Sequence, residues 1–96
     1  MGIIVFMYYI YMIKNQHDKL YTGITENLKQ RLRYHNTQQG AQFTKSKSKF
    51  PIVFYEGYET LAKARKREIQ IKKWRRDKKE MFIERFRKNL PTKSLI

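Results

Sequence analysis

The segment IIVFMYYIYMIKNQHDKLYTGIT, residues 3–25, predicts the centre of the fold, a hairpin of two strands joined by a short turn. Its apolar part, Ile3–Ile13, is rich in β-branched and aromatic side chains, which indicates a strand buried on both faces. These eleven residues are too few to span the ~30 Å of membrane hydrocarbon as a helix. The polar residues 15–18 predict the turn, and Lys19–Thr25 predict the returning strand.

The rest of the chain predicts three helices and one more strand around this hairpin. Leucines four residues apart indicate a helix over residues 27–36, with Thr25 or Asn27 as its cap. Residues 37–51 are polar and basic, which predicts a loop with a short helical piece. The later elements are a strand over Ile52–Glu59, a helix capped by Thr60 that runs to about Trp74, and a last helix over about Asp77–Asn89.

This order, β-β-α-β-α-α, predicts a small α+β domain with a three-stranded antiparallel sheet flanked by helices. With 96 residues, the chain has room for one domain and one modest core. We expect this single domain to span residues 1–96, with its core over about 8–89. Residues 90–96, which include Pro91, are expected to form a frayed tail.

The uneven charge of the chain indicates a polyanionic partner. The net charge is +14, and residues 45–96 carry seventeen Lys and Arg against six acids, compared with five against two in residues 1–44. Nucleic acid is the most common partner of such a protein, ahead of an anionic membrane surface and of a merely solvated cationic face. The absence of cysteine excludes disulfides and thiolate zinc sites. No signal-peptide pattern is present, so a cytoplasmic location is expected.

One acidic residue stands in the most basic segment, KARKREIQIKKWRRDKK at residues 63–79. In the predicted helix, Glu68 lies four residues after Ala64 and therefore within the apolar stripe, whereas Arg67 is placed on the solvated face. A carboxylate on the packed side of a helix is costly unless it is paired or binds a cation. An ion pair with Arg65 or Lys72 and a bound cation are both compatible with the pattern.

Several further side chains are predicted to converge on one face of the sheet. Arg31 and His35 are four residues apart and border the apolar stripe of the first helix, so both lean toward the sheet. The strands contribute the hydroxyls of Tyr9, Tyr11 and Tyr21. Alone, a strand tyrosine is usually a core residue and a single histidine is usually structural. An arginine, a histidine, tyrosines and a glutamate that converge on one face of the sheet are the parts of a phosphodiesterase.

The ordered set of these residues resembles the GIY-YIG nuclease superfamily, in particular its small stand-alone bacterial members. YIY at residues 9–11 and YTG at residues 21–23 resemble the paired signature of the family. ITENLKQRLRYHN, residues 24–36, resembles its first helix. EGYETLAKARKREIQIKKWRRDKKEMFI, residues 56–83, resembles its third strand and metal-binding helix. The resemblance covers about residues 8–83, which is most of the chain.

The resemblance implies a chemical role for four of these residues. Glu68 corresponds to the sole protein ligand of one divalent ion, Mg²⁺ or Mn²⁺, which suits the tendency of magnesium to keep its water ligands. Arg31 corresponds to the arginine that stabilises the pentacovalent phosphorane. Tyr11 corresponds to the residue that deprotonates the attacking water, and His35 is the alternative base or proton relay because the unperturbed pKa of a histidine, ~6.5, is nearer to neutral.

The remaining signature residues have supporting roles in the resemblance. Tyr21 corresponds to a residue that orients the water or its partner, and Gly23 permits close approach of the backbone at the strand. Tyr9 stands where the family's first signature has glycine. A late-helix asparagine that many members carry has no match here, because residues 79–82 read Lys-Glu-Met-Phe.

Together these features predict a metal-dependent endonuclease that hydrolyses phosphodiester bonds in DNA rather than RNA, with selectivity for structure more than for sequence. The alternative is a non-catalytic basic module that binds nucleic acid, with Glu68 only ion-paired. A membrane role is disfavoured because the basic residues circle their helix. A monomer is expected, and Trp74 is expected to pack in the core. The predicted contacts to nucleic acid are Lys45, Lys47, Lys49, Arg65, Lys72, Lys73, Arg75 and Arg76.

Overall fold

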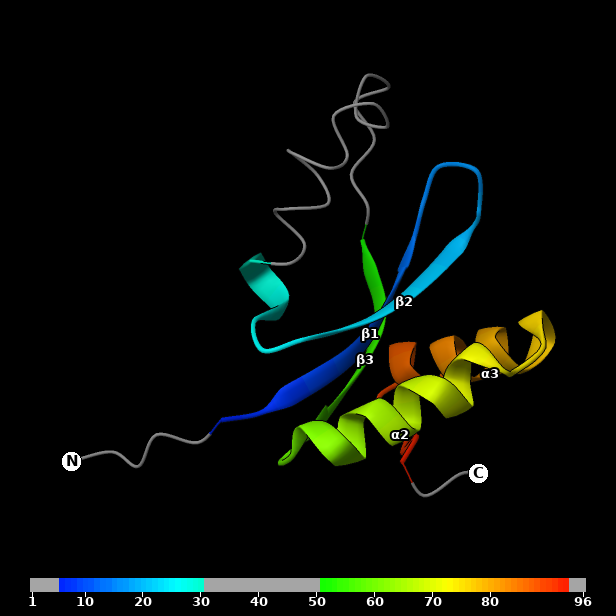
Figure 1. Cartoon of the computed structure of the whole chain (residues 1–96). Coiled ribbons are helices and arrows are strands. Elements are labelled where there is room, and N and C mark those ends of the chain that lie inside the picture. Colours follow the sequence, from blue (N-terminus) through cyan, green and yellow to red (C-terminus); the bar gives the residue numbers. More distant parts are fainter. Residues whose placement is uncertain (1–5, 31–50, 94–96) are drawn as a thin grey trace.

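Three antiparallel strands form the centre of the protein (Figure 1), whose computed structural model describes residues 6–30 and 51–93. β1 spans Tyr8–Lys14, β2 spans Leu20–Thr25 and β3 spans Ile52–Tyr58. The sheet order is β2-β1-β3, so β1 is the central strand and β2 and β3 are the edges. This arrangement confirms the predicted three-stranded antiparallel sheet. The sequence predicts the first strand over Ile3–Ile13, and in the structure β1 starts at Tyr8. Residues 1–5 lie outside the described part of the chain.

The predicted turn between β1 and β2 is built around one side chain. Asn15 Oδ1 accepts hydrogen bonds from the backbone N–H of His17 at 2.8 Å and of Lys19 at 2.9 Å. Asp18 has a φ of 63°, a left-handed conformation that Asn and Asp tolerate better than most residues. The returning strand begins at Leu20, one residue later than the sequence predicts.

Two helices cover one face of the sheet (Figure 1). α2 spans Leu61–Lys72 and α3 spans Arg76–Arg87, each within one or two residues of the predicted bounds. Thr60 caps α2 as predicted, because its hydroxyl accepts a hydrogen bond from the backbone N–H of Lys63 at 3.2 Å.

The chain also turns into a helix directly after β2, and residues 28–30 are helical. Of the two candidate caps, Asn27 is the one used, because its Oδ1 accepts a hydrogen bond from the backbone N–H of Gln30 at 2.9 Å. Thr25 instead bonds to the backbone of Asn27 at 3.1 Å. The rest of this predicted helix and residues 37–50 of the predicted loop lie outside the described residues.

The main core lies between the sheet and the two helices α2 and α3. Its fully buried side chains come from two strands and both helices, namely Ile10, Met12, Phe54, Ala64, Ile71 and Phe82. Trp74 packs on Phe82 with ring centroids 4.2 Å apart, as expected for a core residue. On the opposite face of β1, Tyr11 and Ile13 are at most 5% exposed. β1 is therefore buried on both faces, as its apolar sequence predicts.

A buried ion pair joins β3 to α2. Arg67 donates from Nε and Nη2 to the two carboxylate oxygens of Glu56, at 2.9 and 3.1 Å, and the Tyr58 hydroxyl donates to the same carboxylate at 2.9 Å. Gln70 Oε1 accepts a further bond from Arg67 Nη1 at 2.7 Å. Arg67 is 7% exposed, so the prediction that it lies on the solvated face is wrong. A helical projection of α2 considers only the residues of that helix. It therefore places Arg67 in solvent, because it does not include Glu56 on β3.

The Tyr58 phenol reflects the same environment. Burial is the main reason that the pKa of Tyr58 lies far above its usual value, and the charge of Glu56 and its hydrogen bond raise it further, while Arg67 lowers it. Tyr58 is therefore a stable donor to Glu56 well above neutral pH. Within residues 6–30 and 51–93, no buried side-chain nitrogen or oxygen is left without a partner.

The segment that follows α3 packs against this network. Asn89 has a φ of 60° and ends the helix, and the next N–H bonds back to the Arg85 carbonyl at 2.9 Å. Thr92 is buried, and its carbonyl accepts a hydrogen bond from Arg67 Nη2 at 3.2 Å. The prediction of a frayed tail is therefore wrong for residues 90–93, because the buried Arg67 binds the Thr92 carbonyl and Arg85 Nε donates to the Pro91 carbonyl at 2.8 Å. Residues 94–96 lie outside the described part.

Candidate active site

The signature tyrosines lie on the face of the sheet opposite to α2 and α3. Tyr9 and Tyr11 alternate with the core residues of β1, and the strand period of two places them on the other face. Across the β1–β2 ladder, Tyr11 pairs with Gly23 and Ile13 pairs with Tyr21. Paired residues share a face, so this part of the predicted convergence is observed. Arg31 and His35 lie outside the described residues.

Each tyrosine of the first signature lies over a glycine on a neighbouring strand. A Cβ atom added to Gly23 would come within 2.7 Å of the Tyr11 hydroxyl oxygen and 2.8 Å of its ring. Gly57 stands in the same relation to Tyr9, with a Cβ-to-ring distance of 3.0 Å. The two halves of the paired signature are therefore linked by packing across the sheet. Gly23 makes room for a side chain, not for the close backbone approach that the sequence suggested.

The two tyrosines named as catalytic differ in their access to solvent. Tyr21 is 44% exposed, whereas Tyr11 is 5% exposed. Tyr21 can therefore reach a water or a substrate without any rearrangement. The Tyr11 ring lies over Gly23 of β2, so its hydroxyl is directed toward the β2 edge of the sheet.

Glu68 lies on α2, which packs on the opposite face of the sheet from these tyrosines. The prediction that the glutamate and the tyrosines converge on one face is therefore wrong for Glu68, because α2 packs on the face that carries Ile10 and Met12. Its side chain is 15% exposed, as the position in the apolar stripe predicts, and its Oε2 lies 3.1 Å from Lys72 Nζ. Of the two partners that the sequence allows, Lys72 is therefore the one observed. Lys72 is itself 54% exposed, and such a pair contributes less than ~1 kcal/mol. The ion-pair partner of the Glu68 carboxylate is therefore an exposed lysine and not a buried cation.

Glu68 and Arg65 line a hollow of about 760 Å³ between α2 and the end of β2. The opposite wall is formed by the turn into the first helix. Polar groups dominate that wall, which consists of Thr25, Glu26, Asn27 and Gln30. The apolar part of the lining is Phe6, Tyr8, Ile24 and Leu61. Among the described residues, the signature side chains at positions 9, 11, 21 and 23 are not part of this lining.

The edge strand β2 connects the two groups of residues. Gly23, which lies beneath Tyr11, directly precedes Ile24 and Thr25, which line the Glu68 hollow. Tyr11 and Glu68 thus approach β2 from its two faces, and among the described residues β2 pairs with no strand other than β1. An elongated ligand that lies along this edge can meet both faces. The candidate site is therefore the β2 edge together with the Glu68 hollow.

The donors around Glu68 fit a hard divalent cation. The hollow is lined by the carboxylates of Glu68 and Glu26 and by amide and hydroxyl groups of Asn27, Gln30 and Thr25, and oxygen is the ligand that such cations prefer. Within the described residues, no group of three or more His, Cys, Asp or Glu side chains gathers in one place. One or two carboxylates completed by water and substrate oxygens match the coordination habit of Mg²⁺, not that of a closed structural metal site.

The predicted contacts to nucleic acid fall into three groups. Arg65 and Lys73 are exposed, and Arg75 has a 90% exposed side chain that lies 3.7 Å from Asp77. Lys72 is paired with Glu68, as described above. Lys45, Lys47 and Lys49 lie outside the described residues. Of the members that the structure describes, Arg65 alone lines the Glu68 hollow.

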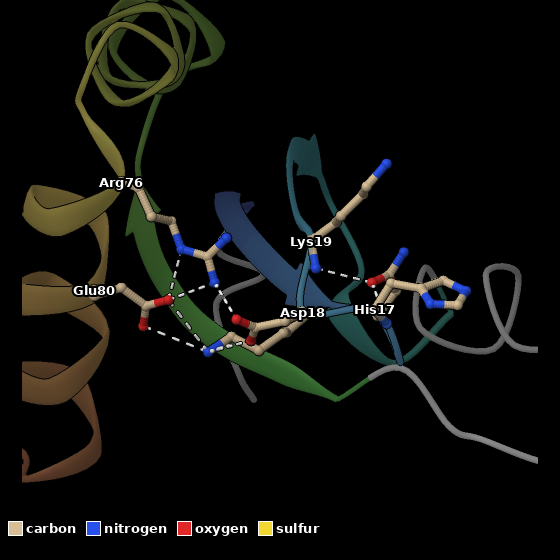
Figure 2. A network of polar contacts seen from close by, with 7 residues as sticks. His17, Asp18, Lys19, Arg76 and Glu80 are labelled. Atoms are coloured by element: carbon tan, nitrogen blue, oxygen red, sulfur yellow. Dashed lines mark hydrogen bonds and ion pairs between the residues drawn. The ribbon is translucent and has the colours of Figure 1, made fainter.

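Arg76 has a structural role that the sequence did not indicate. Figure 2 shows its guanidinium between Glu80 on α3 and Asp18 in the turn after β1, with nitrogen-to-oxygen distances of 2.6 and 3.2 Å. Lys14 contacts both of the same carboxylates at 3.4 Å. This network fastens the hairpin turn to the start of α3. Arg76 is thus shared between acids, and its contact with nucleic acid stays a prediction.

Sequence reasoning missed the long-range partners in and around the site. Glu56 and Arg67 are eleven residues apart on different elements, and only the packing of α2 on the sheet makes them neighbours. Gly57 gave a weak signal, since an isolated glycine inside a strand pattern indicates close packing above it. The sequence indicated Asn27 as a helix cap, but no pattern in it predicted that Asn27 and Gln30 form a wall of the Glu68 hollow.

Comparison with known proteins identifies the family. The model of the GIY-YIG catalytic domain matches residues 7–81, which is most of the chain and includes both signatures and Glu68. The chain belongs to the GIY-YIG family. Its GIY-YIG domain is 39% identical over 76 residues to a UPF0213 protein of Staphylococcus saprophyticus, covering 79% of this chain and 93% of that one. It is 34% identical over 77 residues to a UPF0213 protein of Haloquadratum walsbyi, covering 80% and 86%.

A solved structure gives the same fold for the GIY-YIG domain. The solution NMR structure of a UPF0213 protein from Bacillus halodurans superposes with a TM-score of 0.54 at 26% identity, covering 81% of this chain and 83% of that one. Membership places the protein in a nuclease superfamily and thereby indicates a nucleic-acid substrate. In the described part of the chain, none of the helices has the length and apolar character needed to cross a membrane.

Proposed function

We propose that this GIY-YIG protein is a divalent-metal-dependent endonuclease that hydrolyses phosphodiester bonds in DNA. The observation that carries the proposal is Glu68, a mostly buried acid on a basic helix that faces a polar hollow. Its ion-pair partner Lys72 is exposed and can move away at little cost. An acid of this kind is available to a cation that arrives with a phosphate.

In this proposal the residues around the hollow divide the work. Glu68 holds Mg²⁺ or Mn²⁺, with Thr25 and Asn27 oxygens within the same lining. The bound ion supplies Lewis-acid stabilisation of the charge on the scissile phosphate and the leaving oxygen. Arg65 lines the same hollow, and its planar guanidinium is suited to bind phosphate oxygens. Lys73 and Arg75 add exposed positive charge along the same part of the chain.

We assign the proton-transfer roles to residues at the β2 edge. Tyr11 is the proposed base, ahead of His35, and its hydroxyl lies above Gly23, one residue before the hollow begins. Tyr21 is exposed enough to orient the attacking water. Arg31, which follows Gln30 of the hollow wall in the chain, is proposed to stabilise the transition-state charge. The scissile phosphate would lie at the β2 edge, within reach of Tyr11 from one face of the sheet and of Glu68 from the other.

A panel of labelled nucleic acids tests this proposal. Duplex, single-stranded, flapped and branched DNA, and the matching RNA molecules, are incubated with the purified protein in Mg²⁺, in Mn²⁺ or in EDTA. We expect cleavage of at least one DNA structure with either ion and none with EDTA. A protein that cuts no substrate with either ion, while it remains folded by circular dichroism, contradicts the proposal.

The second candidate function is a basic nucleic-acid-binding module without catalysis. The observation that favours it is the 3.1 Å contact between Glu68 and Lys72, which satisfies the acid without any metal. This alternative predicts nucleic-acid affinity that is unchanged by divalent ions and no cleavage in the panel above.

A further inference from the structure

A second hollow lies on the side of α2 that is turned away from Glu68. It has a volume of about 590 Å³ and is formed by α2, the end of β3 and the segment after α3. We refer to it as the lysine groove. Its lining residues are Tyr58, Lys63, Lys66, Arg67, Ile69, Gln70, Lys73 and Lys93.

Helix geometry separates this groove from the Glu68 hollow. Leu61, Arg65 and Glu68 follow one another at intervals of four and three residues and form one side of α2. A second row begins two residues later and repeats at intervals of three or four residues: Lys63, Lys66, Gln70 and Lys73. At 3.6 residues per turn, an offset of two residues is about 200° around the helix. The two hollows therefore lie on opposite sides of one helix that is ~10–12 Å across.

The lysine groove carries positive charge that the described part of the chain does not neutralise. Within residues 6–30 and 51–93, Lys63, Lys66 and Lys73 form no ion pair, and the lining contains no carboxylate. Arg67 adds no net charge, because Glu56 pairs with it behind the groove. Elsewhere on the same helix, Lys72 has an acid partner.

The segment after α3 supplies the fourth lysine and fixes it in place. The Lys93 ammonium lies 4.4 Å above the Tyr58 ring and donates to the Gly57 carbonyl. Tyr58 is in turn held by Glu56 through its hydroxyl. The ordering of residues 90–93 on the buried ion pair therefore positions a cation on the far wall of the groove. Four like charges around one hollow repel one another unless an anion lies between them.

We propose that the lysine groove binds the sugar-phosphate backbone of a nucleic acid, at a stretch of the strand other than the one held at Glu68. This inference rests on the proposed function, because the nucleic acid bound in the groove is the same molecule that is the substrate at Glu68. Nucleic acid is favoured over an acidic protein segment because α2 presents both hollows, and a strand that crosses it meets phosphate-binding cations on each side. Lysine ammonium groups bind phosphates as point charges, without requiring one orientation. The groove thus contributes affinity and not base readout.

The test compares two matched double variants in a binding assay without divalent ions. Lys63→Gln with Lys66→Gln removes two charges from the groove, and Lys79→Gln with Lys88→Gln removes two charges on and just after α3, away from both hollows. The probe is a fluorescein-labelled DNA duplex with a single-stranded flap, titrated in EDTA at several salt concentrations. We expect the groove variant to bind several-fold more weakly, with a salt slope smaller by about 0.9 for each duplex phosphate that it no longer neutralises. The control variant should bind like the wild type.

Several results overturn the inference. They are equal losses of affinity in the two double variants, an unchanged affinity of the groove variant, and a wild type that binds no DNA. Poly-glutamate is added as a competitor. If it displaces the probe from the wild type as effectively as unlabelled DNA does, the groove is assigned to an acidic protein segment. Binding in EDTA needs no cleavage, so a protein that binds through the groove but cuts nothing refutes only the proposed function. A protein that cuts DNA equally well with and without the groove lysines refutes only this inference.

Discussion

Replacing Glu56 with glutamine removes one acceptor from a buried group of donors. The carboxylate is 2% exposed at its side chain and accepts three hydrogen bonds, from Arg67 Nε, Arg67 Nη2 and the Tyr58 hydroxyl. Glutamine has the same shape but only one oxygen. Whichever way its amide turns, an NH₂ group faces a donor, and the Arg67 charge is left uncompensated.

The expected loss of stability is large for a domain of this size. Removing one partner of a buried ion pair costs about 3–5 kcal/mol, and each kcal/mol lowers the Tm of a domain of fewer than ~100 residues by about 4–8 °C. The Tm of Glu56→Gln should therefore fall by at least about 12 °C. Since small domains have only about 5–15 kcal/mol of stability, part of the variant can be unfolded at room temperature.

Trp74 provides the assay. It is the chain's single tryptophan, and its ring centroid lies 5.1 Å from the Arg67 guanidinium carbon, so its fluorescence reports on this part of the core during urea unfolding. Glu59→Gln is the matched control, because Glu59 is exposed and lies just after the same strand. A Glu56→Met, Arg67→Met double variant should recover most of the stability, since apolar replacements of a buried pair are often neutral. A Glu56→Gln protein within ~0.5 kcal/mol of the control would refute this reasoning.

Three further predictions concern the tyrosines. Gly23→Ala should displace the Tyr11 ring, because the new Cβ lies 2.7 Å from its hydroxyl oxygen, and should destabilise the protein by about 1–3 kcal/mol in thermal melts while it lowers cleavage. Tyr58 has a raised pKa in the folded protein, so its contribution to stability is complete below ~10, the pKa of an unfolded tyrosine, and is lost as the pH rises through the folded value. Tyr58→Phe should abolish that part of the alkaline loss in melts recorded across this range. Tyr11→Phe should strongly reduce the cleavage rate with little change in Tm, and a fully active Tyr11→Phe beside an inactive His35→Ala would move the base assignment to His35.

The sequence predicted those features of the fold that depend on neighbouring residues. The turn at Asn15, the cap at Thr60 and the strand positions follow from local hydrogen bonding and from alternation along the chain. The features that it missed depend on distant partners. Arg67 looked like a solvated cation because its acid is on β3, and residues 90–93 looked frayed because their donors come from α2 and α3.

The candidate site was predicted to a similar extent. The position of Glu68 in the apolar stripe indicated its burial correctly, because helical periodicity alone decides which side faces the core. The pairing of Tyr11 with Gly23 depends on the register of the hairpin. A turn that is longer or shorter by one residue would shift this register and move the β2 side chains to the opposite face. The lysine groove could not be predicted, because it depends on the packing of Lys93 against Tyr58, and no local sequence pattern encodes that contact.

The most direct test of the proposed metal-dependent nuclease compares Glu68→Gln with Lys72→Gln in single-turnover cleavage over a range of Mg²⁺ concentrations. Both changes break the same 3.1 Å ion pair, and both should leave the Tm close to that of the wild type because the pair is partly exposed. If Glu68 binds the metal, Glu68→Gln loses Mg²⁺-dependent cleavage. Lys72→Gln then keeps it and reaches half-maximal rate at a lower Mg²⁺ concentration, since a competing cation has been removed. Equal cleavage by the two variants, whether both are active or both are inactive, would contradict the role of Glu68 as the metal ligand.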